Sequence, residues 1–152
     1  MDKIPLILDD IDKRIIDELQ RDGRMPYIEI ANKLGVSDGT IRLHTKRLIK
    51  RGILKISASI NPFFFKAGLT ALIGMKLERR THKKVMENLL KLKGVLSAIN
   101  AAGTFDLFVE VFFSSRDELN KFLMEELSII EGIQATETFI YLDAKNKWIQ
   151  LP

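Results

Sequence analysis

The residues with the most distinctive chemistry lie between positions 37 and 51, where basic side chains accumulate. No aspartate or glutamate occurs between Asp38 and Glu78. The basic residues at the start of this gap are Arg42, Lys46, Arg47, Lys50 and Arg51. Ammonium and guanidinium groups bind phosphates, and arginine also makes paired hydrogen bonds to guanine. The segment therefore has the chemistry to bind a nucleic acid.

Two short helices are expected to position these side chains. Pro26 suits the first turn of one helix, because proline lacks the amide that is unpaired there. Gly35 allows a tight turn, and Ser37 can cap the second helix. At about 100° per residue, Ile41, Thr45 and Leu48 fall on one side of that helix. The opposite side carries Gly39, Arg42, Leu43, Lys46 and Lys50.

This arrangement is typical of a helix-turn-helix whose second helix enters the major groove of DNA. Arg42 is the candidate for contact with guanine, while Lys46, Arg47 and Lys50 are candidates for phosphates. Gly39 would allow close approach to the duplex. The full set of predicted DNA-binding residues is Ser37, Gly39, Thr40, Arg42, Leu43, Lys46, Arg47 and Lys50. The alternative is a solvated basic helix in a three-helix bundle with no ligand.

A further helix is predicted before this motif. Asp9 or Asp10 can cap it, and acidic residues near its start favour the positive end of the helix dipole. Apolar residues then recur at helical spacing, namely Ile11, Ile15, Ile16 and Leu19. Gly23 is expected to end the helix in a left-handed conformation. We therefore predict a helical DNA-binding domain over residues 1–53, followed by a strand-like linker over 54–62.

Residues 63–152 have a different pattern, which predicts a second domain. Strands are expected at 69–77, 95–102, 107–113 and 134–142, and helices at 83–92 and 115–127. The order βαββαβ is that of a ferredoxin-like sandwich, so the fold class is α+β. Residues 107–113 are apolar at nearly every position, although the helices can cover one sheet face only. A second copy of the chain is expected to cover the other face, giving a homodimer.

Composition excludes several classes of protein. The chain has no cysteine and only two histidines, so we predict no metal site, no cofactor and no catalytic residues. No apolar run reaches the roughly 18 residues needed to span a membrane. The apolar patch at the start is too short for a signal peptide. The sequence is that expected of a cytoplasmic protein.

Taken together, the two halves resemble the Lrp/AsnC, or feast/famine, family of transcription regulators. The first half carries Leu8-Asp9-Asp10-Ile11-Asp12, Ile30-Ala31, Leu34-Gly35-Val36-Ser37, Thr40-Ile41, Arg47-Leu48 and Gly52-Ile53-Leu54. Asn61-Pro62 through Gly68 mark the domain junction, and Gly103-Thr104-Phe105-Asp106 matches a G-x-x-D signature. Two residues depart from the pattern: His44 stands where many members have arginine, and Gly39 is unusual early in a recognition helix.

The resemblance implies a winged-helix-type DNA-binding domain and a ligand-sensing domain, often called RAM. It also implies dimers that assemble further, commonly into octamers, and effectors that are amino acids or related small metabolites. By position, the effector-binding residues would be Gly103, Thr104 and Asp106, with Thr136 and Thr138 of the last strand nearby.

Three alternatives remain at the level of sequence. The Gly103–Asp106 segment is also a good hairpin turn, in which Asp106 would bind amides of its own loop. The same sandwich occurs in enzymes and their regulatory subunits, although Asp106, Glu110 and Glu137 have no nucleophile or metal beside them. An architectural protein that compacts DNA without sequence preference is the third.

Overall fold

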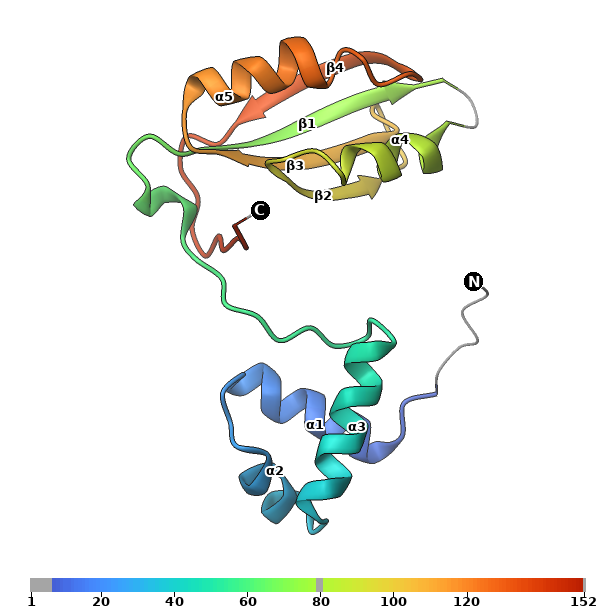
Figure 1. Cartoon of the computed structure of the whole chain (residues 1–152), viewed down its shortest axis with the longest axis vertical. Helices are drawn as coiled ribbons and strands as arrows, with labels where there is room; N and C mark the ends of the chain where they lie inside the picture. The colour runs from blue at the N-terminus through green and yellow to red at the C-terminus, as the bar shows by residue number, and fades with distance from the viewer. Residues whose placement is uncertain (1–6, 79–80, 152) are drawn as a thin grey trace. The chain divides into compact units, whose positions relative to one another are not determined.

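The computed structural model describes residues 7–78 and 81–151. It divides into two compact units, Met1–Ser57 and Ala58–Pro152. The first unit is helical and the second is built around a four-stranded sheet (Figure 1). Within the described ranges, no helix is long and apolar enough to cross a membrane.

The first unit contains helices α1 (Asp10–Arg21), α2 (Tyr27–Leu34) and α3 (Asp38–Lys50). Asp9 caps α1 in a capping box, in which its side chain accepts from the amide of Asp12 and the side chain of Asp12 accepts from the amide of Asp9. Ser37 caps α3 by accepting from the amide of Thr40. The predicted start of the second helix of the motif is therefore confirmed.

Gly35 ends α2 in the left-handed region, with φ of 71°. A side chain with a Cβ is strained there, so the turn into α3 depends on glycine. The predicted left-handed conformation of Gly23 is wrong. Helix α1 ends at Arg21 with Asp22 as an extended C-cap, and Gly23 does not have a positive φ.

The core of the first unit joins all three helices. It is formed by Ile15 and Leu19 of α1, Ile30 and Ala31 of α2, and Ile41 of α3. These side chains are between 0 and 6% exposed. Burial of this stripe fixes which side of α3 faces inward.

The linker lacks the predicted strand character over residues 54–59, which have no regular secondary structure. Only Ile60 pairs, in an isolated antiparallel bridge to Ile149. A strand needs a partner with free backbone groups, and in this segment Ile60 is the residue that has one. A short 3-10 helix, η1 (Pro62–Phe64), follows.

The sheet of the second unit has the predicted connectivity. Its strands are β1 (Leu69–Leu77), β2 (Val95–Asn100), β3 (Leu107–Phe113) and β4 (Ile133–Ile140), in the antiparallel order β2-β3-β1-β4. Helix α4 (His82–Leu89) lies between β1 and β2 in sequence. Helix α5 (Arg116–Lys121) continues into a π-helical turn, η2 (Phe122–Glu126), before β4.

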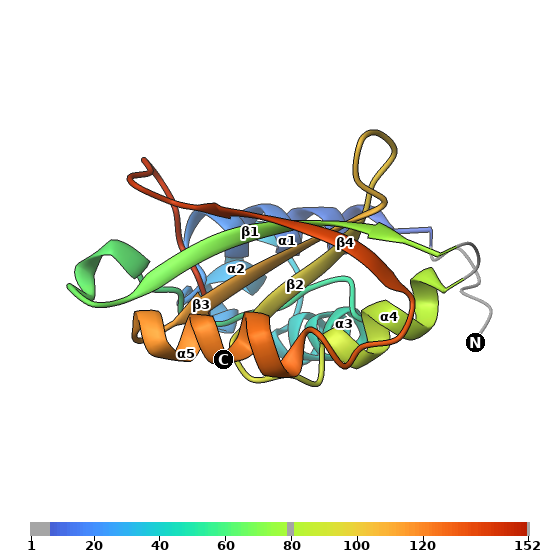
Figure 2. The same ribbon diagram turned by 90° about the horizontal axis from the view of Figure 1, so that it is seen from above.

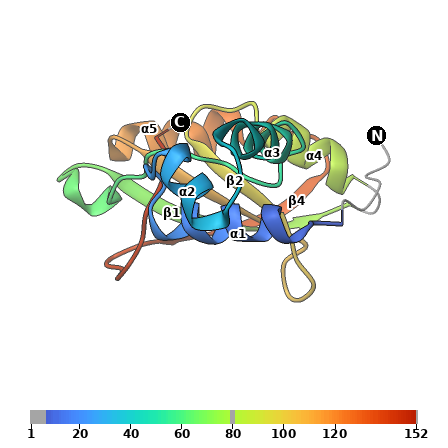
Figure 3. The same cartoon turned by 90° about the horizontal axis from the view of Figure 1, so that it is seen from below.

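Helices α4 and α5 lie on the same face of the sheet (Figure 2). Alternate residues of β1 and β3, such as Ile73 and Val109, pack there against Val85 of α4 and Phe122. The loop between β2 and β3 and the segment after β4 project on the other side, as the opposite view confirms (Figure 3). We call that side the open face.

Aromatic side chains gather on the open face. Phe105 packs edge-on against Phe108 and Phe139, with ring centroids 5.6 and 6.3 Å apart. A Cβ at Gly74 would lie 2.7 Å from the Phe105 ring, so glycine allows that ring to lie on the strand. Ile99 and Phe139 are more than 40% exposed.

Polar groups lie beside these aromatic side chains on the open face, because Glu110 and Phe139 both pair with Leu72 of β1, from opposite sides. Glu110 accepts a hydrogen bond from the hydroxyl of Tyr141 at 2.9 Å and forms an ion pair with Lys147 of the C-terminal segment. Burial and the neighbouring Glu110 carboxylate raise the pKa of Tyr141 to about 12. Glu110 is therefore engaged in structure, and among the described residues it belongs to no metal-ligating group.

Candidate nucleic-acid interface

Helix α3 has one buried side and one exposed side, as its sequence predicts. Ile41, Thr45 and Leu48 are 0 to 1% exposed and face α1 and α2. The exposed residues on the opposite side are Gly39, Arg42, Leu43, Lys46 and Lys50. The basic residues among them are available to a ligand outside the unit.

Arg42 is exposed but held in place. Its Nε donates to Asp38 at 2.6 Å, one helical turn earlier, and its guanidinium lies over the Tyr27 ring of α2, 5.4 Å from the centroid. The Arg42 side chain is still 65% exposed. These contacts restrict its rotamers, so less conformational entropy would be lost if it bound a ligand.

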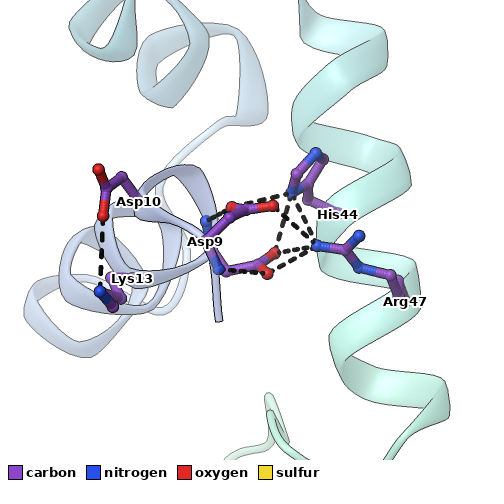
Figure 4. Close-up of polar contacts among 6 residues, drawn as sticks. Asp9, Asp10, Lys13, His44 and Arg47 are labelled. Carbon is purple, nitrogen blue, oxygen red and sulfur yellow. Dashed lines mark hydrogen bonds and ion pairs between the residues drawn. The ribbon is translucent and has the colours of Figure 1, made fainter. Parts of the chain in front are cut away.

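A charged network ties α3 to the start of α1 (Figure 4). Nη2 of Arg47 lies 2.7 and 2.6 Å from the two carboxylate oxygens of Asp12 and 3.3 Å from Asp9. Nδ1 of His44 lies 2.9 Å from Asp12. The Asp12 side chain is completely buried. We call these four residues the α1–α3 clamp.

The clamp changes the protonation equilibria of its members. Burial acts to raise the pKa of Asp12, but hydrogen bonds from Arg47 and His44 outweigh it and the pKa is lowered. The amide of Asp12 lowers the pKa of Asp9. The hydrogen bond to Asp12 raises the pKa of Arg47 above its ordinary value. The carboxylates and the guanidinium therefore remain ionised together near neutral pH.

The clamp gives Arg47 a role that differs from the one predicted. We expected Arg47 to contact phosphate, which stays a prediction; in the structure its guanidinium is bound to the carboxylates of Asp9 and Asp12. The sequence contained a signal that Asp12 needs a cation, although not which one. Asp12 lies on the buried stripe with Ile15 and Leu19, at the i, i+3, i+7 spacing, and a carboxylate at such a position needs a cation.

Other candidates at the helix start are also engaged within the chain. The hydroxyls of Ser37 and Thr40 lie 2.9 Å apart, and Ser37 caps the helix. Both residues lie at the N-terminus of α3. An additional contact with DNA there remains a prediction.

Among the described residues, Asp9, Asp12 and His44 bring three potential metal-ligating atoms within 4.8 Å of one another. Arg47 already lies against both carboxylates. Its positive charge occupies the place that a cation would take, so these residues fit a guanidinium rather than a metal ion.

The predicted effector residues lie near one end of the sheet but do not form one pocket. The amide of Asp106 donates to the carbonyl of Met75 at 2.9 Å, and its carboxylate accepts from the amide of Leu77 at 2.8 Å. The carboxylate therefore binds the end of β1 and not its own loop. Gly103 and Thr104 are exposed in the loop before it.

The two threonines lie on the other side of β1. Thr136 pairs with Met75 and Thr138 pairs with Ile73 in the β1–β4 ladder. Thr136 also lines a groove of about 220 Å³ between η2 and β4, together with Leu123, Leu127 and Ser128. Asp106 does not line this groove, so a single chain divides the predicted effector residues between two places.

Family models match both units. Residues 8–55 match the winged helix-turn-helix DNA-binding model, and residues 70–147 match the Lrp/AsnC ligand-binding domain. The second match covers more than half of the chain. The chain belongs to the Lrp/AsnC family of transcriptional regulators.

Relatives within the family support this assignment along the whole chain. An uncharacterised HTH-type transcriptional regulator of Pyrococcus furiosus is 43% identical over 145 residues, which are 93% of this chain and 96% of the relative. The HTH-type transcriptional regulator FL11 of the same organism is 34% identical, with 96% and 97% covered.

Solved structures of Lrp/AsnC proteins have the same architecture. AsnC of E. coli aligns with a TM-score of 0.72 and 27% identity, covering 91% of this chain and 95% of that one. The leucine response regulatory protein of Mycobacterium tuberculosis aligns with a TM-score of 0.79 and 26% identity, covering 92% and 96%. The chain is thus a DNA-binding transcriptional regulator with a ligand-binding domain, and not an enzyme.

Proposed function

We propose that this regulator recognises a specific operator, and that an amino acid or related small metabolite modulates its assembly or its DNA affinity. The observation that carries the DNA part is the exposed basic side of α3, opposite the buried Ile41, Thr45 and Leu48. Arg42, Lys46 and Lys50 are the contacts we propose, with Arg42 directed to guanine and the lysines to phosphates.

The test is a salt titration of binding to selected and to scrambled duplexes. A protein that makes roughly 6–10 phosphate contacts loses about 10³–10⁵ in affinity between 50 and 200 mM salt. A specific regulator keeps its preference for the selected duplex across this range, whereas an architectural protein shows none. Absence of salt-dependent DNA binding would contradict the proposal.

Variants identify the surface responsible. The double variant Arg42→Ala, Lys46→Ala is expected to weaken binding by at least tenfold, because each basic contact releases counterions and Arg42 also reads a base. Lys83→Ala, Lys93→Ala removes the same charge from the second unit, where the side chains are 91% and 85% exposed. This control is expected to bind nearly as the parent does.

We also propose that the open face pairs with the open face of a second copy. Ile99 and Phe139 are exposed there beside the half-buried Phe105 and Phe108, and α4 and α5 leave this side uncovered. A two-fold dimer presents two copies of α3, which suits a palindromic operator with half-sites about 34 Å apart. Larger assemblies, such as octamers, would then be built from these dimers.

The effector proposal places the ligand between copies of the chain. Gly103, Thr104 and Asp106 lie on one side of β1 and Thr136 and Thr138 on the other, so a single copy does not gather them. Thermal-shift measurement with each of the twenty amino acids tests for a ligand. At about 100 times its dissociation constant, a ligand adds about 2.7 kcal/mol to stability. No shift with any amino acid would contradict an amino-acid effector.

A further inference from the structure

Leu43 is an apolar side chain at the centre of a basic surface. It is 68% exposed, and the neighbouring positions on this side of α3 carry Arg42, Lys46 and Lys50. Single exposed leucines are common on protein surfaces, so exposure alone indicates nothing. The position of Leu43 on the helix is what distinguishes it.

At about 100° per residue, Leu43 lies almost directly opposite the middle of the buried side. Together with Lys50, it therefore points most directly away from α1 and α2, and it is the apolar member of that pair. Helical side chains lean toward the N-terminus, which places Leu43 over the turn that contains Gly39. A Cβ at Gly39 would meet only the Ser37 hydroxyl, at 3.7 Å, so that turn is open to an incoming surface.

The major groove contains one kind of apolar group at the base edges, the C5-methyl group of thymine. We infer that Leu43 contacts a thymine methyl group in each half-site of the operator and so contributes to sequence recognition. The inference rests on the proposed DNA-binding function and deepens it, because it names the base that an uncharged residue of α3 selects.

Arg42 is expected to contact a second base, close to the thymine that Leu43 contacts. Its Nε is bound to Asp38, so paired contact with the O6 and N7 atoms of guanine would use the two terminal nitrogens. Arg42 and Leu43 are consecutive on α3, and both side chains are exposed. A thymine and a guanine within one or two base pairs of each other are therefore expected in each half-site.

The experiment replaces thymine by uracil, which removes only the methyl group. Operators are first selected from a random duplex library with the full chain, and each thymine is then replaced singly. Loss of one buried methyl contact is expected to weaken binding about fourfold. At one thymine in each half-site, the replacement should affect the parent protein but not Leu43→Ala. 5-Bromouracil, which restores an apolar C5 group, should restore binding.

The matched control is Ile49→Ala, because Ile49 is an aliphatic residue of α3 that is 46% exposed but lies away from the side that carries Leu43. This variant should remain sensitive to uracil. Equal sensitivity of the parent and Leu43→Ala at every thymine would overturn the inference while leaving DNA binding intact. Failure to select any operator would instead overturn the proposed function and this inference together.

Discussion

Asp12 has its carboxylate in the interior of the first unit, where Arg47 and His44 are its partners. Replacement by asparagine keeps the shape but removes the negative charge, leaving Arg47 without its closest counter-ion. Asp12→Asn is expected to lower the free energy of unfolding of the first unit by about 2 kcal/mol, because charge-assisted hydrogen bonds are lost while Arg47 keeps Asp9. Urea titration followed by amide hydrogen exchange in α1 and α3 measures this loss.

Asp10 provides the matched control for this substitution. It lies in the same turn of α1, but its side chain is 96% exposed and its ion pair with Lys13 is 3.5 Å long (Figure 4). Exposed ion pairs contribute little to stability, so Asp10→Asn should change the free energy of unfolding by less than about 0.5 kcal/mol. Equal effects of the two substitutions would show that the α1–α3 clamp does not stabilise the unit.

The clamp also predicts a pH dependence. The pKa of Asp12 is lowered in the folded state, because the hydrogen bonds from Arg47 and His44 outweigh the opposing effect of burial. The unfolded carboxyl, with a pKa of about 3.9, therefore takes up its proton first as the pH falls. The stabilisation is complete well above pH 4 and is lost as the pH falls below it through the folded pKa.

The difference in unfolding free energy between the parent and Asp12→Asn measures this term separately from other carboxylates. It should be largest near pH 7 and should decrease steadily as the pH falls below about 4. A difference that stays constant over this range would mean that the Asp12 carboxylate is not stabilised by its partners.

At the scale of elements, the two glycines around the helix-turn-helix are expected to respond in opposite directions to alanine. Gly35 has φ of 71°, so Gly35→Ala should destabilise the first unit by about 1 kcal/mol. Gly39 has no close neighbour except Ser37, so Gly39→Ala should stabilise α3 by up to about 1 kcal/mol. Thermal unfolding of both variants checks the two signs.

Gly39→Ala has a second readout in DNA binding. If the duplex approaches the start of α3 closely, the added methyl group weakens binding even though the helix is more stable. Affinity that rises together with stability would show that Gly39 is not at the contact surface.

Local patterns in the sequence predicted the elements well. Ser37 caps α3, Gly35 makes the turn and Ile41 is buried, because caps, turns and helical periodicity depend on neighbouring residues. The βαββαβ order could be predicted for the same reason, because strand and helix patterns also depend on neighbouring residues. The inward and outward sides of α3 could thus be assigned without coordinates.

Contacts between distant residues could not be predicted in this way. Arg47 meets Asp12 from 35 positions away, and Asp106 binds the amide of Leu77 from 29 positions away. The partner of each charged group depends on how the helices and strands pack. Without that packing, Arg47 was assigned to phosphate and Asp106 was expected either to bind an effector or to bind its own loop.

At the scale of the whole molecule, the dimer proposal depends on the open face of the second unit. An uncovered patch of aromatic and aliphatic side chains is costly in water and is typical of an interaction site. On that face Glu110 is bound to Tyr141 and Lys147, so its charge is already paired within the chain. The apolar surface around Phe139 and Ile99 is therefore where a charge should disrupt association most.

The double variant Ile99→Asp, Phe139→Asp is expected to convert the dimer to a monomer, because pairing would bury several unpaired carboxylates. Sedimentation equilibrium measures the change in mass. Leu90→Asp is the control: Leu90 is also more than 40% exposed, but it follows α4 on the side of the sheet away from the open face, so the dimer should persist. The parent should bind a palindromic operator more tightly than a single half-site. The monomer should lose this extra affinity, because linked binding of two α3 helices is lost. If Ile99→Asp, Phe139→Asp remained dimeric with an intact fold, the open face could not be the dimer interface.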